Sequence, residues 1–165
     1  VATLYINDGN TFLYKACGKQ ESQGFEIDLN WDITSNLSLI ASYGYTTTEN
    51  KEISNKELTN VPHHTANIFV TYKLSSINLP DYYIGGGTRF IGGKYADEAN
   101  NIKLDSALIY NATVGYKKGN WRANLSVQNL TNEEYVDGAL ISDARGTRVY
   151  AGTPRTFLAS VSYKF

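Results

Sequence analysis

The sequence predicts an all-β protein, an antiparallel β-barrel whose strands cross a membrane. Three observations support this fold class. Apolar and polar residues alternate in six segments, the connections between segments alternate between short and long, and aromatic residues gather beside the short connections. A strand presents successive residues to opposite faces, so a sustained period of two indicates a sheet with one apolar and one polar face.

The six alternating segments carry an aliphatic or aromatic residue at every second position. They are residues 25–33 in GFEIDLNWDI, 37–45 in NLSLIASYGYT, 66–74 in TANIFVTYKL, 108–116 in LIYNATVGYK, 121–127 in WRANLSVQ and 157–165 in FLASVSYKF. None of these apolar positions is charged, although charged residues make up 19% of the chain. The apolar face is therefore expected to meet either a protein core or lipid.

Two further strands are indicated less strongly. The segment YYIGGGTRFIGG, residues 82–93, alternates, but its glycines thin both faces. Residues 1–8 are expected to form the end of an eighth strand. The chain thus accounts for about seven or eight strands.

The connections indicate which way the apolar face points. They are short at residues 34–36 and 118–120, moderate at 75–81, and longer near 48–61, 96–104 and 136–153. Because hairpin ends alternate between the two rims of a barrel, all the short ones fall on one rim. Short turns on one rim and long loops on the other are typical of outer-membrane barrels, whose apolar face points outward to lipid.

Side-chain chemistry at the strand ends favours the same orientation. Aromatic rings near the short turns suit a belt at the membrane interface: Trp31, Tyr72, Tyr82, Tyr116, Trp121, Tyr163 and Phe165. The polar face includes several charges that suit a wet lumen: Glu26, Asp28, Asp32, Lys73, Lys117, Arg122 and Lys164. The chain is therefore expected to contact outer-membrane lipid.

Composition excludes several other classes. Fifteen basic residues balance sixteen acidic ones, so no electrostatic footprint for nucleic acid exists. Cys17 is the only cysteine, which excludes an internal disulfide and a metal site built on several thiolates. No apolar run reaches the length of a spanning helix. The chain contains no Met, so Val1 is expected to begin a processed chain or a piece of a longer one.

Six short motifs, in order, resemble the TonB-dependent outer-membrane receptors of the ferric-siderophore type. They are SQGFE, VPHHTA, GGGTRFIGGKY, NLTNEEY, AGTPRT and SYKF, and together they cover nearly the whole chain. The resemblance implies a barrel of about 22 strands with a plug domain inside. Residues 1–165 would then be the C-terminal portion of that barrel, and the plug domain would be absent from this chain.

The resemblance also implies function and partners. We expect a protein of the bacterial outer membrane that takes up a ferric siderophore, energised by the TonB complex through the missing N-terminal region. Iron would arrive inside its chelator as cargo, so neither a cofactor nor direct metal ligation is expected. Tyr163 and Phe165 would form the C-terminal membrane-insertion signal for the outer-membrane assembly machinery.

Ligand contacts are expected in the long loops, because loops on a rigid scaffold carry binding chemistry. The segment DGALISDARGTRVYAGTPR offers Arg145, Arg148 and Tyr150, two cations and a ring that could meet an anionic or carbonyl-rich ferric chelate. Tyr95, with Asp97 and Glu98, is a weaker candidate.

Other motifs do not support a further site. His63 and His64 are adjacent, so in a strand they point to opposite faces and cannot easily share a metal. The glycine-rich segment departs from a phosphate-binding loop, and Gly85 and Gly87 are expected to make room for a bulky neighbour such as a plug. No catalytic constellation converges in any loop, so we do not expect an enzyme.

Two alternatives remain open from the residues alone. A small self-contained outer-membrane barrel with a structural or adhesin role needs eight closed strands. A soluble lipid-carrying barrel would instead turn the apolar face inward.

Overall fold

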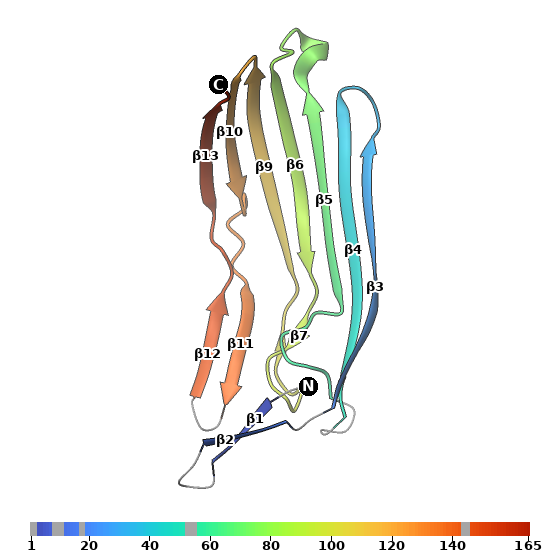
Figure 1. The fold of residues 1–165 in the computed structure, drawn as a ribbon, viewed down its shortest axis with the longest axis vertical. Coiled ribbons are helices and arrows are strands. Elements are labelled where there is room, and N and C mark those ends of the chain that lie inside the picture. The colour runs from blue at the N-terminus through green and yellow to red at the C-terminus, as the bar shows by residue number, and fades with distance from the viewer. Residues whose placement is uncertain (1–2, 8–11, 17–18, 52–55, 143–145) are drawn as a thin grey trace.

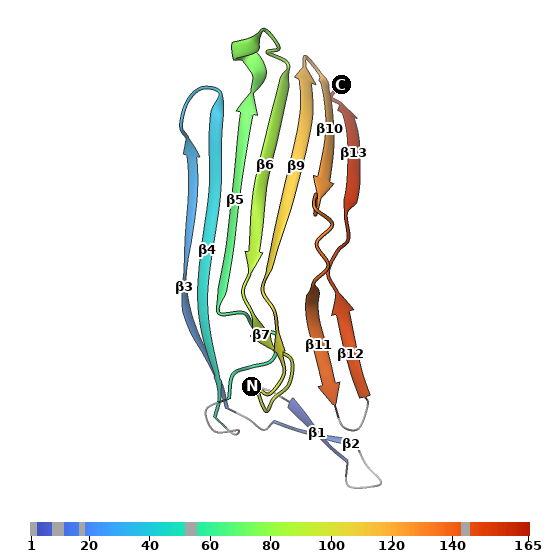
Figure 2. The ribbon, with the colours of Figure 1, turned by 180° about the vertical axis from the view of Figure 1, so that it is seen from behind.

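The structure, a computed structural model, describes residues 3–7, 12–16, 19–51, 56–142 and 146–165. Seven strands form one antiparallel sheet in the spatial order β13-β10-β9-β6-β5-β4-β3 (Figures 1 and 2). Their bounds are β3 (Gln20–Asp32), β4 (Leu37–Asn50), β5 (His64–Lys73), β6 (Tyr82–Ile91), β9 (Ala107–Lys118), β10 (Trp121–Gln128) and β13 (Thr156–Tyr163). The all-β antiparallel fold and the seven predicted strands are confirmed.

Three small two-stranded sheets lie toward the end of the main sheet that carries the long connections (Figure 1). They pair β1 (Thr3–Asn7) with β2 (Phe12–Ala16), β7 (Lys94–Tyr95) with β8 (Lys103–Leu104), and β11 (Val136–Ser142) with β12 (Gly146–Ala151). The predicted eighth strand at residues 1–8 does not join the seven-stranded sheet at residues 3–7, because β1 pairs locally with β2, and residues 1, 2 and 8 lie outside the described residues. Closing a short hairpin costs less chain entropy than reaching a distant strand.

The three shorter connections share the opposite rim, where the C-terminus also lies (Figure 1). Thr34 Oγ1 accepts the N–H groups of Asn36 and Leu37 at 3.2 and 3.0 Å. A 3-10 turn (Leu74–Ile77) joins β5 to β6, and Gly119 adopts a left-handed φ of 54° between β9 and β10. These local turns fix the hairpin registers.

The strand register places the alternating apolar positions of the sheet on one face. Directly opposed residues share a face, and the register opposes Ile27 to Tyr43, and Leu125 to both Val114 and Ala159. This face is exposed along its length, with Ile27 58% and Val161 71% exposed. Such a continuous exposed apolar surface requires lipid or a partner to cover it.

The sheet is open. Strands β3 and β13 are its two edges, and they do not pair with each other in the part of the chain that the structure describes. The structure therefore does not close seven strands into a small self-contained barrel. Within the described residues, no helix is long and apolar enough to cross a membrane.

Aromatic side chains form two belts on the apolar face. Beside the short turns, the rings of Tyr82 and Tyr116 lie 5.0 Å apart and those of Trp121 and Tyr163 lie 4.9 Å apart. A second belt, absent from the sequence-based prediction, lies nearer the long loops. Its rings are those of Phe25, Tyr43, Tyr45 and His64, with neighbouring centroids 5.1–6.1 Å apart.

The two belts bound the apolar face at both ends. Along β3, Phe25 of one belt and Trp31 near the short turns are six residues apart, about 20 Å along the strand. An apolar band flanked by aromatic girdles is typical of the lipid-facing surface of an outer-membrane barrel.

Candidate functional site

The hairpin of β11 and β12 carries two of the predicted ligand-binding residues on one face. Arg148 lies opposite Leu140, and Tyr150 lies opposite Gly138. Because alternate residues of a strand share a face, Arg148 and Tyr150 project together from β12. Arg148 is exposed and Tyr150 is 53% exposed, so both are available to a ligand. Arg145, the third predicted residue of this segment, lies outside the described residues.

Tyr95 lies in β7, on a different connection at the same rim. It is half-buried, and its carbonyl oxygen accepts the main-chain N–H of Asn60 at 2.7 Å. Among the described residues, no hydrogen bond, ion pair or ring contact joins Tyr95 to Arg148 or Tyr150. The structure thus brings Tyr95 to the same end of the sheet as the hairpin without pairing the side chains.

The side-chain amide of Asn60 joins the connection at residues 56–63 to strand β11. Asn60 Nδ2 donates to the carbonyl oxygen of Ala139 at 2.8 Å, and Asn60 Oδ1 accepts the N–H of Ala139 at 2.9 Å. Asn60 has a φ of 62°, a left-handed conformation that asparagine tolerates better than most residues.

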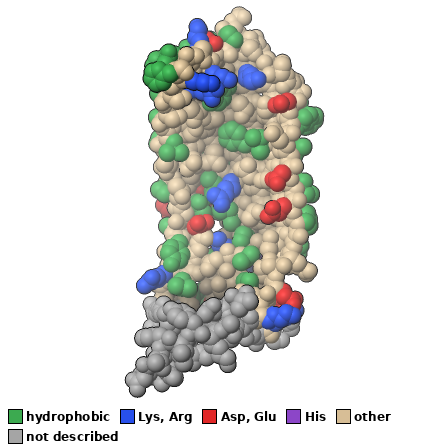
Figure 3. Space-filling view, viewed as in Figure 1, with side chains coloured by type: hydrophobic (Ala, Val, Ile, Leu, Met, Phe, Trp, Pro, Cys, Tyr) green, Lys and Arg blue, Asp and Glu red, His purple; other side chains and the backbone are tan. Residues whose placement is uncertain are grey.

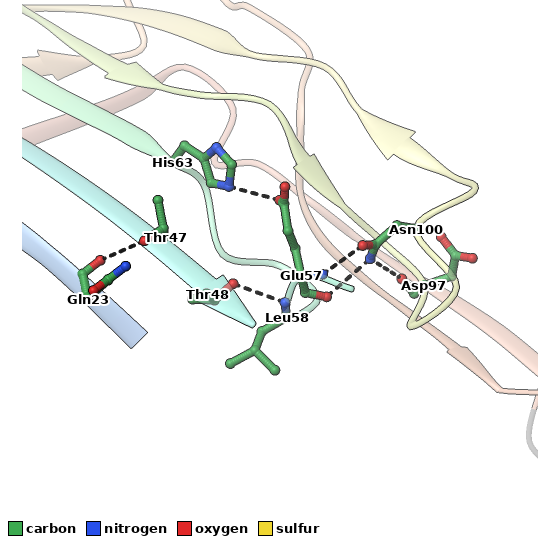
Figure 4. Close-up of polar contacts among 8 residues, drawn as sticks. All are labelled: Gln23, Thr47, Thr48, Glu57, Leu58, His63, Asp97 and Asn100. Carbon is green, nitrogen blue, oxygen red and sulfur yellow. Dashed lines mark hydrogen bonds and ion pairs between the residues drawn. The ribbon is translucent and has the colours of Figure 1, made fainter. Parts of the chain in front are cut away.

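The same reciprocal pairing occurs between Asn100 and Glu57 (Figure 4). Asn100 Oδ1 accepts the N–H of Glu57 at 2.7 Å, and its Nδ2 donates to the Glu57 carbonyl oxygen at 3.1 Å. This contact ties the connection at residues 92–106 to the one at residues 56–63, so three long connections are joined through two asparagines.

The Asp97 carboxylate organises the tip of the connection between β7 and β8. It accepts the main-chain N–H groups of Ile102 at 2.8 Å and Asn101 at 3.2 Å. These bonds, chiefly that from Ile102, hold the pKa of Asp97 below its ordinary value. These hydrogen bonds give Asp97 a structural role. The next residue, Glu98, lines a small hollow together with Gln20 and Glu57.

The two histidines have different partners. The Tyr43 hydroxyl lies 2.8 Å from His64 Nδ1 on the apolar face. His63 Nε2 lies 2.9 Å from the Glu57 carboxylate, but the angles do not fit a hydrogen bond (Figure 4). The contact is an ion pair only when the imidazole is protonated. In the part of the chain described, no cluster of three or more His, Cys, Asp or Glu residues could hold a metal ion.

Asn129 anchors the base of the β11–β12 hairpin. It is 1% exposed and has a φ of 51°. Its amide donates to the carbonyl oxygens of Glu133 and Thr153 at 2.8 and 2.9 Å and accepts the Glu133 N–H at 2.8 Å. The segments that enter and leave the hairpin are therefore held together by one buried side chain.

The polar face of the sheet is charged and hollowed. Figure 3 displays this face, with acidic side chains over the right-hand strands and basic ones at its middle and upper end. In that view β3, which carries Glu26, Asp28 and Asp32, lies on the right. A hollow of about 330 Å³ is lined by Arg89, Asn111, Gln128 and Tyr135, among other residues.

Gly85 and Gly87 do make room for a bulky neighbour, but the sheet itself supplies one. A Cβ atom at Gly85 would lie 2.8 Å from Cε1 of Phe69, and one at Gly87 would lie 2.6 Å from Cδ2 of the same ring. The two glycines therefore accommodate the Phe69 ring of β5.

Sequence-based reasoning missed the bridging asparagines. Asn60, Asn100 and Asn129 precede or follow predicted strands, and asparagine in a connection is a common signal for a left-handed turn residue. That signal could have predicted their backbone conformation, but not the long-range partners Ala139, Glu57 and Thr153, which lie 79, 43 and 24 residues away in the chain.

Comparisons with known proteins agree with this fold. The family model "TonB dependent receptor-like, beta-barrel" matches residues 1–130. An uncharacterized TonB-dependent receptor of Haemophilus influenzae is 35% identical over 147 residues, covering 79% of this chain and 41% of the relative. A ferrioxamine receptor of Yersinia enterocolitica is 29% identical and covers 92% of this chain and 22% of the relative.

Solved structures agree as well. The ferric-catecholate import receptor Fiu of Escherichia coli K12, in its closed form, superposes with a TM-score of 0.71 at 25% identity. That match covers 99% of this chain and 23% of the receptor. The chain thus spans less than half of the length of these relatives.

Proposed function

Because this chain belongs to the TonB-dependent receptor family, we propose that it is the C-terminal portion of a barrel that imports a ferric siderophore across the outer membrane. Receptors of this kind are outer-membrane β-barrel proteins of Gram-negative bacteria, and they act in transport. Residues 1–165 supply the last strands of the barrel wall. The plug domain and the segment that contacts TonB belong to the rest of the protein.

The presentation of Arg148 and Tyr150 carries the proposal. They project from one face of β12 at the rim of the long connections, and both are exposed. Asn129 holds the base of their hairpin through its bonds to Glu133 and Thr153. A guanidinium and an aromatic ring side by side can meet an anionic or carbonyl-rich ferric chelate by charge, hydrogen bonding and stacking. Arg145 and Tyr95 are the further candidates for this site. Iron is cargo inside the chelator and no cofactor takes part.

The proposed partners follow from the two faces and the two rims. Outer-membrane lipid covers the apolar face between the aromatic belts. The TonB complex acts from the periplasmic side through the N-terminal region. Tyr163 and Phe165, whose rings lie 5.1 Å apart at the C-terminus, serve as the insertion signal for the assembly machinery.

Uptake by cells that express the complete receptor tests the proposal. The substrates are ⁵⁵Fe-labelled ferrioxamine B, ferrichrome and a ferric catecholate, measured with and without TonB. Arg148→Ala and Tyr150→Ala should each weaken binding of the accepted chelate by about tenfold, a loss of about 1.4 kcal/mol.

Val149→Ala is the matched control. Val149 lies on the same strand, is 60% exposed and projects from the opposite face. If Arg148→Ala and Tyr150→Ala are as harmless as Val149→Ala, the ligand site lies elsewhere. If no ferric chelate is imported in a TonB-dependent manner, the proposed function is wrong.

A further inference from the structure

We propose that Asn60 is a positioning residue for ligand binding, because it fixes the β11–β12 hairpin and thereby Arg148 and Tyr150. The ligand-binding part of this inference depends on the proposed function. The mechanical part, that Asn60 immobilises the hairpin, stands on geometry alone.

The side-chain amide of Asn60 pairs with β11 as the main chain of a neighbouring strand would. Both main-chain groups of Ala139 bond to Asn60, at 2.8 and 2.9 Å, so this edge of β11 points away from β12. Ala139 is 3% exposed, and water therefore cannot easily take over these bonds. At Ala139, the Asn60 side chain therefore ties this edge of β11 to the connection at residues 56–63.

A second contact holds the same edge two residues earlier. Lys94, which is 7% exposed, donates from Nζ to the Asp137 carbonyl oxygen at 2.5 Å. Its neighbour Tyr95 accepts the main-chain N–H of Asn60 at 2.7 Å. Asn60 therefore lies at the junction of the connection at residues 56–63, strand β7 and strand β11.

Local geometry suits asparagine at this position. The φ of 62° strains most side chains, and the short amide reaches both main-chain groups of Ala139. Gly138 leaves the necessary room, because a Cβ atom there would lie 3.3 Å from Asn60 Oδ1. That same Cβ position is 3.8 Å from the Tyr150 ring, so the amide and the ring flank one glycine.

The path from Asn60 to the ligand-binding residues is short. Gly138 is the partner of Tyr150 in the hairpin register, and Leu140 is the partner of Arg148. Ala139 lies between Gly138 and Leu140. Releasing Ala139 therefore frees the stretch of β11 that sets where Arg148 and Tyr150 stand.

The test compares Asn60→Gly with Asn100→Gly in the complete receptor. Glycine tolerates both left-handed positions, so each change deletes an amide without straining the backbone. Asn100 makes the same type of reciprocal pair, but with Glu57 in place of the hairpin. A nitroxide at Val149→Cys, with Cys17→Ser and any other cysteine of the receptor replaced, reports hairpin motion without a ligand.

Asn60→Gly should sharpen the nitroxide spectrum and raise the KM for ⁵⁵Fe-chelate uptake by about tenfold with little change in maximal rate. The chelate is whichever of ferrioxamine B, ferrichrome and the ferric catecholate the wild-type receptor imports. Asn100→Gly should leave both readouts near wild type. If Asn60→Gly assembles poorly, Gly138→Ala takes its place as the test variant. Its added Cβ atom crowds the Asn60 amide from the hairpin side, so it should change the nitroxide spectrum and the KM in the same direction.

The outcomes separate the two claims. An unchanged nitroxide spectrum in both Asn60→Gly and Gly138→Ala overturns the mechanical claim. A mobile hairpin with unchanged KM overturns the positioning role. If Arg148→Ala also leaves uptake unchanged, the site under the proposed function fails, independently of the nitroxide result.

Discussion

The ring of Phe69 on β5 covers Gly87 on β6, leaving no space for a side chain at that glycine. A Cβ atom at Gly87 would lie 2.6 Å from Phe69 Cδ2 and would also collide with the carbonyl oxygen of Ile68. Backbone atoms cannot move aside cheaply, so this lumen-side contact holds β5 and β6 at a close fit.

Gly87→Ala should therefore destabilise the barrel by about 1–3 kcal/mol, because overpacking forces the ring or the strand to shift. The neighbouring Gly86→Ala is the control, since its Cβ would meet only Asn111 O, at 3.8 Å. Urea unfolding of the complete receptor, followed by heat-modifiable gel mobility, measures both. Equal midpoints for the two variants would contradict the packing argument.

Asn129→Gly should loosen the base of the β11–β12 hairpin. The change keeps the φ of 51° but removes three hydrogen bonds from a buried side chain. Each polar group left buried without a partner costs about 1–3 kcal/mol.

Asn132→Gly, which has a similar φ of 56° but an exposed side chain with one bond to Arg155 N, should cost less. Limited proteolysis between residues 129 and 155 compares the two variants. Cleavage at the same rate in both would show that the buried amide does not hold the hairpin.

Two adjacent residues on β13 test which face meets lipid. Ala159 lies opposite Leu125 on the apolar face, whereas Ser160 lies opposite Asn124 on the polar face. Ala159 and Ser160 lie four and three residues before Tyr163 of the belt beside the short turns, at the level of the apolar band. Ala159→Arg should cost about 2–4 kcal/mol by placing a cation at mid-membrane, and Ser160→Arg should cost little.

Two measurements give the readout. The first is the amount of folded receptor in the outer membrane, and the second is the quenching, by brominated lipid tails, of a fluorophore attached at each position. If lipid tails reach Ser160 but not Ala159, the orientation of the sheet is reversed.

The hydrogen bonds that the Asp97 carboxylate accepts in the connection between β7 and β8 should be lost in acid. The pKa of Asp97 is lower in the folded protein than the ordinary 3.8, so the unfolded chain binds the proton first as the pH falls. The stabilisation is present above about pH 4 and is lost as the pH falls through the folded-state pKa.

Hydrogen exchange of the Ile102 amide between about pH 3 and pH 5 follows this loss. Asp97→Asn should remove most of this pH dependence, whereas Asp105→Asn, at an exposed aspartate of the same connection, should retain it. An Ile102 amide whose protection does not depend on Asp97 would contradict the assignment.

The seven strands, their two faces and the short-turn rim were predictable because they depend on local periodicity. In residues 25–33, for example, alternation alone assigns Ile27 and Asp28 to opposite faces, and the structure confirms it. The position of Arg148 and Tyr150 in a long connection was equally local. Their shared face within a hairpin was not, because their segment lacks a clear alternation of apolar and polar residues.

Tertiary structure decided what joins distant parts of the chain. The sequence by itself determined which residues can face lipid and which can face water, since a strand turns every second side chain the same way. It did not determine that Asn60 bonds to Ala139, that Phe69 covers Gly87 or that β1 pairs with β2. Those contacts depend on which segments the folded sheet brings together, and hydrogen-bonding capacity and shape become specific only when that neighbour is in place.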